Sequence, residues 1–274
     1  MPKSRKRYLN PSVFWSIRHG FPTWLRPVLM LGALAVAFLL WSALSYSGYV
    51  DEIFLPTPTA VVAAGQEMVQ KGHLFDDILS STGRVMAGFG LATLIGIPLG
   101  ILMGTFYSMD SLFGGFVGTV RYMPTAAFTP LIIVWVGIDE LPKVLIVCLG
   151  IVFYNAIMMA DAVKFIPDET LNVAYTLGAS RLDVLFRVIL PATLPSIVDT
   201  LRVNIAGAWN FLVIAELLAA ESGLGYRIRL SERTLQTDNI LFCILVIGCI
   251  GLLTDIAFKL LARWLLPWAE STRR

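Results

Sequence analysis

The stretch from Val28 to Val50 contains no charged residue, and this feature restricts the chain more than any other. An α-helix rises about 1.5 Å per residue, so about 20 apolar residues cross a hydrocarbon core about 30 Å thick. The run is too long for the core of a signal peptide, and no small-residue cleavage site follows it. We therefore expect a retained membrane span.

The composition also indicates an integral membrane protein. Of the 274 residues, 57% are hydrophobic and 15% are charged, and the mean hydropathy is +0.74. A soluble domain carries about 25% charged residues, so one integral membrane domain is the simplest interpretation. The net charge of +2 does not favour an acidic partner such as nucleic acid.

Further apolar runs predict an all-α bundle of six spans. The third span contains Arg121 and the fifth contains Glu216, so these two are the least regular. The predicted organisation is a basic segment at 1–27, a membrane domain at 28–266 and a tail at 267–274. The spans are expected at about 28–48, 85–107, 112–137, 143–163, 196–220 and 240–264, with a loop at 165–195.

Lysine and arginine residues predict the orientation. With the N-terminus inside the cell, the basic N-terminal segment, the loop at 165–195 and the C-terminal tail all lie in the cytoplasm. The loop at 221–238 is the exception, because it places three arginines outside. The balance favours two cytoplasmic termini in a plasma membrane.

Small residues predict how the helices pack. Gly96, Gly100 and Gly104 recur every four residues, and Gly114 and Gly118 repeat the spacing on the next span. Such ridges let two backbones approach closely where lipid supplies no hydrophobic drive. They indicate a packed bundle and no particular activity.

The segment NVAYTLGASRLDVLFRVILPATLP, at 172–195, is charged and lies between two apolar runs. A helix is expected to start at Asp168, after a proline, and to end at Gly178, because glycine accepts the left-handed conformation. Leu171, Ala174 and Leu177 fall on one face of that helix.

A second helix is expected to follow at once. Ser180 and Asp183 resemble a capping box, and Pro191 and Pro195 are expected to end the element. The resulting hairpin would lie in the cytoplasm, where a half-apolar helix suits docking into a groove of a partner. An ordinary capped loop between two spans is the alternative.

The spacing of Ala174, Gly178, Leu190-Pro191 and Pro195 resembles the EAA loop of permease subunits in ATP-binding-cassette (ABC) importers. In that family the loop contains a coupling helix that fits a cleft of the cytoplasmic ATPase. The sequence departs from the pattern where Asn172 and Val173 replace the usual Glu and Ala. The resemblance assigns ATPase coupling to Asn172, Ala174, Gly178, Ala179, Ser180, Leu190, Pro191 and Pro195.

Nearly the whole chain resembles the sulfonate, taurine and nitrate branch of the type I importers. The segments that carry the resemblance are FLPTPTAVV, SSTGRVMAGFGLATLIGIPLG, RYMPTAAFTPLIIVWVGI and SGLGYRIRLSERTLQTD. The resemblance implies a bacterial inner-membrane permease that forms a homodimer, with two ATPase subunits and an extracytoplasmic solute-binding protein. It also implies a path for an organic sulfonate, taurine or a related oxyanion, with nitrate, bicarbonate or a thiamine-precursor pyrimidine as alternatives.

The energy source is expected to be another chain. No GxxxxGK[ST] phosphate loop occurs, so ATP and Mg²⁺ would be held by a partner subunit, and no catalytic residue, cofactor or metal is assigned to this chain. A secondary transporter would need buried carboxylates near the midplane, and only Glu216 comes close. A structural scaffold would have no need of polar residues inside its spans.

Polar residues inside spans are the candidates for the substrate path. Arg121 either binds an anionic cargo or is a helix-end arginine that reaches the inner interface. Glu216 either pairs with Arg227 or Arg229, which we favour, or acts as a gate. Arg84 is interpreted as an anchor at a helix end. Two adjacent pairs either line a path or make interhelical hydrogen bonds: Tyr154 with Asn155, and Trp209 with Asn210.

Overall fold

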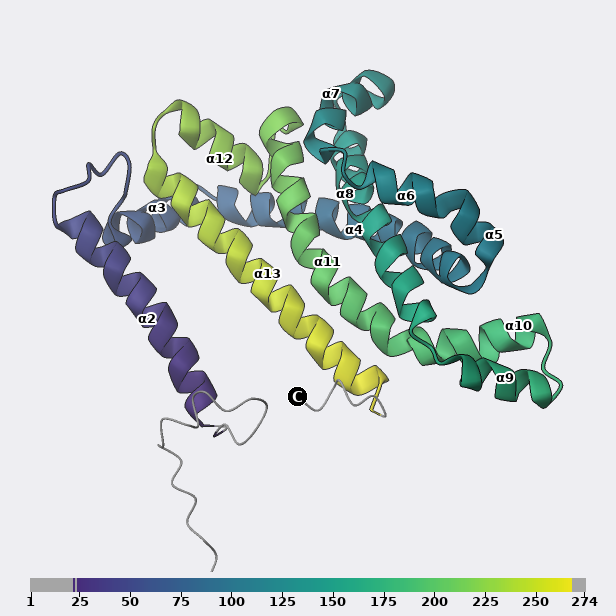
Figure 1. The fold of residues 1–274 in the computed structure, drawn as a ribbon. Helices are drawn as coiled ribbons and strands as arrows, with labels where there is room; N and C mark the ends of the chain where they lie inside the picture. Colours follow the sequence, from purple (N-terminus) through teal and green to yellow (C-terminus); the bar gives the residue numbers. More distant parts are fainter. Residues whose placement is uncertain (1–21, 23, 268–274) are drawn as a thin grey trace, which may run out of the picture. The chain divides into compact units, whose positions relative to one another are not determined.

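The computed structural model describes residues 22 and 24–267, and these residues form helices and connecting turns (Figure 1). Contacts divide the chain into a unit that ends at Ala60 and a unit that begins at Val61. Most of the expected cytoplasmic segment at 1–27, and all but one residue of the tail at 267–274, lie outside the described residues.

The first unit is built on one apolar helix, α2 (Leu25–Tyr46). Its mean hydropathy is 2.2, and its length and composition are those of a membrane span, as the sequence predicts. The segment after it folds back through two hydrogen bonds. The Trp41 indole nitrogen donates to the Pro56 carbonyl at 3.0 Å, and the Tyr46 and Thr59 hydroxyls lie 2.9 Å apart.

The second unit holds the remaining spans. Four of its helical segments are long and apolar enough to cross a membrane, and one of them, Arg181–Ala219, combines two labelled helices. A bent pair of helices, Tyr107–Val120 with Thr125–Val136, gives a further candidate span. Its elements begin with α3 (Pro58–Gln70), whose residues 58–60 belong to the first unit. They continue with α4 (His73–Thr105), α5 (Tyr107–Met109), a π-turn (Asp110–Gly114), α6 (Gly115–Val120), α7 (Thr125–Val136), α8 (Glu140–Lys164), α9 (Asp168–Thr176), α10 (Arg181–Val184), a second π-turn (Leu185–Ile189), α11 (Leu190–Ala219), α12 (Leu224–Arg233) and α13 (Thr237–Leu265).

The centre of this unit is the contact between α4 and α8. A Cβ added to Gly96 would lie 2.6 Å from the Val152 carbonyl oxygen, and one added to Gly100 would lie 2.6 Å from the Met159 Cβ. Gly104 meets α8 in the same way. The predicted glycine ridge on this span is therefore confirmed, because any side chain on it would collide with α8.

The second predicted ridge differs. A Cβ on Gly118 would meet nothing within 4 Å in the described chain, and one on Gly114 would meet only the Asp110 side chain. The four-residue spacing alone therefore does not identify a packing face here. The reason is that α6 turns this face away from its neighbours in the described unit.

The expected third span is not one continuous helix. The pair Tyr107–Val120 and Thr125–Val136 is bent by 100° at a short break that contains Arg121 and Pro124. Proline disfavours helical backbone at the residue before it, and it cannot donate a backbone hydrogen bond. Pro124 accordingly lies just before α7, with ψ at 114°.

The expectation that Pro191 and Pro195 end the hairpin is wrong. Pro191 lies in the first turn of α11, and Pro195 lies inside that helix. The π-turn Leu185–Ile189, directly before α11, widens the helix at the point where Pro191 would otherwise interrupt it. The helical segment consequently runs from Arg181 to Ala219.

The close approach of α4 and α8 generates a stability prediction. Gly100→Ala should destabilise the folded chain by about 1–3 kcal/mol, because the new methyl group overlaps the α8 backbone. Gly90→Ala, on the open side of the same helix, is the matched control and should be neutral or stabilising by about 0.5–1 kcal/mol. Unfolding of the purified protein in detergent measures both, and equal stabilities would contradict the ridge.

Candidate functional site

The hairpin formed by α9 and α10 has a defined backbone turn. Gly178 adopts a φ of 85°, its amide donates to the Tyr175 carbonyl at 2.9 Å, and the Ala179 amide donates to the Ala174 carbonyl at 3.1 Å. These two bonds form a Schellman motif, which ends a helix with its last carbonyls satisfied. The predicted helix start at Asp168 and stop at Gly178 are both confirmed.

The second helix of the hairpin begins with the predicted capping box. The Ser180 hydroxyl accepts from the Asp183 amide at 3.2 Å, and the Asp183 carboxylate accepts from the Ser180 amide at 3.2 Å. Arg187 adds an ion pair to Asp183 at 3.3 Å. Each end of the turn is thus fixed by backbone hydrogen bonds, so the hairpin has one defined shape.

One side of the hairpin is anchored in the bundle. Leu171 and Ala174 pack on a core cluster that includes Ile101 of α4, Met159 of α8 and Ile189. Leu177 does not share this face as expected, because the helix ends at Thr176 and the chain then turns away. Leu177 is 82% exposed.

Four large apolar side chains of the hairpin and of the π-turn after it are exposed in the described chain, among charged and polar neighbours. Val173, Leu177, Leu182 and Phe186 are 59%, 82%, 65% and 61% exposed. An exposed apolar patch beside charged groups marks an interaction surface. We call these four residues the hairpin patch.

The coupling residues expected from the resemblance divide between the hairpin and α11. Asn172, Gly178 and Ser180 are exposed on the hairpin, and the Asn172 carbonyl accepts from the Thr176 hydroxyl at 2.8 Å. Ala174 and Ala179 pack toward the core cluster. Leu190, Pro191 and Pro195 lie in the first turns of α11, next to the hairpin in the chain.

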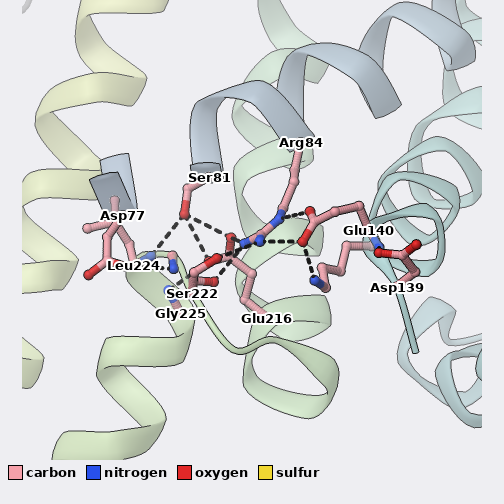
Figure 2. A network of polar contacts seen from close by, with 11 residues as sticks. Asp77, Ser81, Arg84, Asp139, Glu140, Glu216, Ser222, Leu224 and Gly225 are labelled. Carbon is pink, nitrogen blue, oxygen red and sulfur yellow. Dashed lines mark hydrogen bonds and ion pairs between the residues drawn. The ribbon is translucent and has the colours of Figure 1, made fainter. Parts of the chain in front are cut away.

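A network of polar groups, most of them buried, lies at the end of α11 opposite to the hairpin (Figure 1 and Figure 2). Arg84 of α4 is at its centre, with 5% of its surface exposed. Its Nη1 donates to Glu216 at 2.6 Å and to the Ser222 carbonyl at 2.7 Å, while Nε and Nη2 donate to Glu140 at 2.5 and 2.8 Å. The forked contact with Glu140 uses the planar geometry of the guanidinium. One arginine therefore joins α4, α8 and α11.

Glu216 is fully buried and is also held by the start of α12. Its carboxylate accepts from the Ser81 hydroxyl at 2.8 Å and from the Gly225 amide at 2.8 Å. Gly223 has a φ of 108°, and a Cβ there would lie 2.7 Å from the Arg84 Nη1. A buried carboxylate at a helix N-terminus is stabilised by the unpaired amides, so Glu216 positions α12.

A second ion pair, between Asp77 and Arg227, also connects α4 with α12. The Asp77 carboxylate accepts from the Gly223 amide at 2.8 Å and forms an ion pair with Arg227. Lys143, itself 3% exposed, donates to Glu140 at 2.7 Å. The positive and negative side chains of the network are equal in number, and buried charges are tolerated only when they are paired in this way.

The network changes two sequence interpretations. Glu216 forms a buried ion pair, but its partner is Arg84 and not Arg227 or Arg229. Arg229 instead donates to the Ala220 carbonyl at 2.6 Å, at the end of α11. Arg84 is not a simple anchor at a helix end. No local pattern in the sequence connects Arg84 with Glu216, because 132 positions separate them.

The other path candidates do not form one site in the described unit. Arg121 and Tyr154 line the same small pocket. Asn155 is fully buried and accepts from the Asn204 amide at 2.7 Å. Trp209 belongs to the core cluster between α4, α8 and α11, whereas Asn210 is exposed on α11.

Comparison with known proteins places this architecture in context. Residues 96–270 match the model of the family described as binding-protein-dependent transport system inner membrane component. The chain is 34% identical to the taurine transport system permease protein of Escherichia coli K12, over 88% of this chain and 89% of that protein. It is 33% identical to a putative aliphatic sulfonates transport permease protein of Bacillus subtilis 168, over 90% and 89%.

A more distant relative and a solved structure extend the comparison. The bicarbonate transport system permease protein of Synechocystis sp. PCC 6803 is 29% identical over 97% of this chain and 96% of its own length. A chain of the MetNI methionine ABC transporter in an inward-facing conformation superposes with a TM-score of 0.58 at 17% identity, covering 68% of this chain and 94% of that one. This likeness shows the all-α fold of a type I importer permease.

The buried network generates a second stability prediction. Glu216→Ala should destabilise the protein by about 3 kcal/mol, because Arg84 stays buried without its second carboxylate. Glu67→Ala is the control: it removes an ion pair with Lys71 in which both side chains are 61% exposed, and should change stability by less than about 1 kcal/mol. Thermal unfolding in detergent measures the difference. If the two variants lose equal stability, the network does not hold α12 in place.

Proposed function

Since the chain belongs to the family of binding-protein-dependent transport system inner membrane components, we propose that it is the permease subunit of an ABC importer driven by a separate ATPase. The observation that carries the proposal is the hairpin of α9 and α10. It combines a fixed backbone with an exposed apolar patch at one end of the bundle. The permease itself has no catalytic step, and ATP and Mg²⁺ are held by the partner.

The hairpin patch is proposed as the surface that docks into the ATPase. Apolar residues supply the contact area, and Asn172, Gly178 and Ser180 lie exposed beside it. Asn172 stands where the family usually has Glu, so a neutral amide replaces a charge at this contact. The docking surface therefore relies on shape and apolar burial more than on a salt bridge.

The geometry also supports a lever mechanism. The helical segment from Arg181 to Ala219 connects the hairpin to the network around Glu216. A displacement of the hairpin by the ATPase would be carried along α11 to the junction of α4, α8 and α12. ATP binding and hydrolysis would thereby alternate the bundle between inward-open and outward-open states.

The proposed assembly contains two permease copies and two ATPase subunits in a bacterial inner membrane. An extracytoplasmic solute-binding protein delivers the cargo to the face opposite the hairpin. Both termini lie on the cytoplasmic side together with the hairpin. The Arg-rich α12 remains an exception to the charge rule. The ion pair of Arg227 with Asp77 and the hydrogen bond of Arg229 to the Ala220 carbonyl give both arginines a structural role there.

The proposed cargo is an organic sulfonate or taurine. Relatives named for taurine and aliphatic sulfonates are 32–34% identical to the chain, whereas the relative named for bicarbonate is 29% identical. Bicarbonate is the second candidate, followed by nitrate and a thiamine-precursor pyrimidine. A secondary transporter is less well supported, because Glu216, the one carboxylate suited to ion coupling by sequence, is bound by Arg84.

Substitution of Gly178 tests the coupling role. Gly178→Val should abolish ATP-driven uptake of taurine into proteoliposomes that contain the permease, its ATPase and the binding protein. The φ of 85° at this position strains any β-branched side chain, and the hairpin turn would change shape. Insertion of the chain into the membrane should be unaffected.

The matched control is Gly72→Val. Gly72 has a φ of 73° and, like Gly178, has open space around its Cβ position, but it lies between α3 and α4. The two variants therefore carry a similar backbone strain, and only one carries it in the hairpin. Normal uptake by Gly178→Val, or an equal loss in Gly72→Val, would count against the proposed docking surface.

A further inference from the structure

Arg121 lies at the break between α6 and α7, next to the middle of a membrane span. The pocket that it lines is closed on one side by Leu149, Gly150, Phe153 and Tyr154 of α8. These residues lie about 13 Å or more from either end of the 25-residue helix, at 1.5 Å per residue. The charge is therefore near mid-depth of this span.

The depth decides between the two interpretations of Arg121. A helix-end arginine reaches the interface with its side chain, but the distance to either end of α8 is longer than an arginine side chain. A guanidinium near the centre of a membrane is costly unless it faces a polar cavity or a partner. The position of Arg121 therefore favours the first interpretation, in which it binds an anionic cargo.

No carboxylate in the described chain matches this charge. The Arg121 Nη2 donates to the Tyr122 hydroxyl at 2.9 Å, and the guanidinium carbon lies 4.8 Å from the centre of the same ring. Its Nε is buried and has no hydrogen-bond acceptor. Arg121 as a whole is partly exposed. By contrast, Arg84, Arg227 and Arg229 each have a carboxylate or backbone carbonyls as partners.

The groups around Arg121 suit an anion. Thr125 and Tyr154 line the same pocket and carry hydroxyl groups. Thr125 also begins α7, whose first turn has no side-chain cap on its free amides. Hydroxyl and amide donors together with an unmatched guanidinium form a set that a small oxyanion satisfies and a cation does not.

We propose that Arg121, Thr125 and Tyr154 form an anion site at the break between α6 and α7, which holds the sulfonate or other oxyanion group of the cargo during passage. The proposal rests on the proposed function as an importer and adds a residue-level basis for anion selectivity. The broken span explains why the site is here, because interrupted helices expose backbone donors at mid-membrane depth.

The experiment uses the complete transporter in proteoliposomes, with radiolabelled taurine as the probe and saturating taurine-loaded binding protein outside. Two quantities are measured in each sample: taurine uptake and ATP hydrolysis. The variants are Arg121→Gln, Arg121→Lys and Tyr154→Phe. The matched control is Arg263→Gln, which removes an exposed arginine near the end of α13.

Arg121→Gln should lower taurine uptake about tenfold or more, the effect of losing a hydrogen-bonded charge, while ATP hydrolysis stays within about twofold of wild type. Arg121→Lys should recover part of the uptake, since lysine keeps the positive charge but lacks the paired hydrogen-bond donors of the guanidinium. Tyr154→Phe should cause a smaller loss, and Arg263→Gln none.

Uptake by Arg121→Gln at the wild-type level would overturn the anion site while leaving the importer function intact. If Arg121→Gln loses both uptake and ATP hydrolysis, Arg121→Lys decides: recovery supports the site, and no recovery overturns it. Wild-type transport of an uncharged pyrimidine in place of taurine would also overturn it. Failure of the proposed function is distinct, because then the wild type shows no ATP-dependent uptake of any cargo in the panel.

Discussion

The structure depends on the close contact between α4 and α8. In lipid, apolar side chains gain little by leaving one hydrocarbon environment for another, so packing between backbones has to hold the helices together. Gly96, Gly100 and Gly104 make that approach possible, and the core cluster with Trp209 then joins α11 to the pair. The hairpin, the polar network and the pocket at Arg121 all lie against this frame.

Two kinds of polar group occur in this bundle, and their environments distinguish them. Arg84 and Glu216 are matched by each other and by backbone groups, which is the state that a structural ion pair reaches. Arg121 is partly exposed, its buried Nε has no acceptor, and it has no carboxylate among its described neighbours. The contrast separates a junction that holds α12 from a position able to receive a charged ligand.

Local patterns predicted the local features. The capping box at Ser180 and the stop at Gly178 depend on residues three or four positions apart, and both were predictable. The partner of Glu216 was not, since Arg84 lies far away in the sequence. The continuation of the helix through Pro191 is not predictable from the sequence, because a widened turn before a proline has no simple signature. The bend at Pro124 is not visible in the hydropathy, because the apolar character of the segment continues on both sides of it.

The central claim is that the hairpin patch faces an ATPase subunit, and site-directed crosslinking tests it most directly. In a Cys249→Ser background, whose remaining cysteines are buried, a photoactivatable thiol reagent is attached at Leu177→Cys or at Leu235→Cys. Both positions are exposed, at 82% and 67%, but Leu235 lies beyond the other end of α11. The account predicts a covalent product with the ATPase from Leu177→Cys alone. A product from Leu235→Cys, or none from Leu177→Cys, would contradict it.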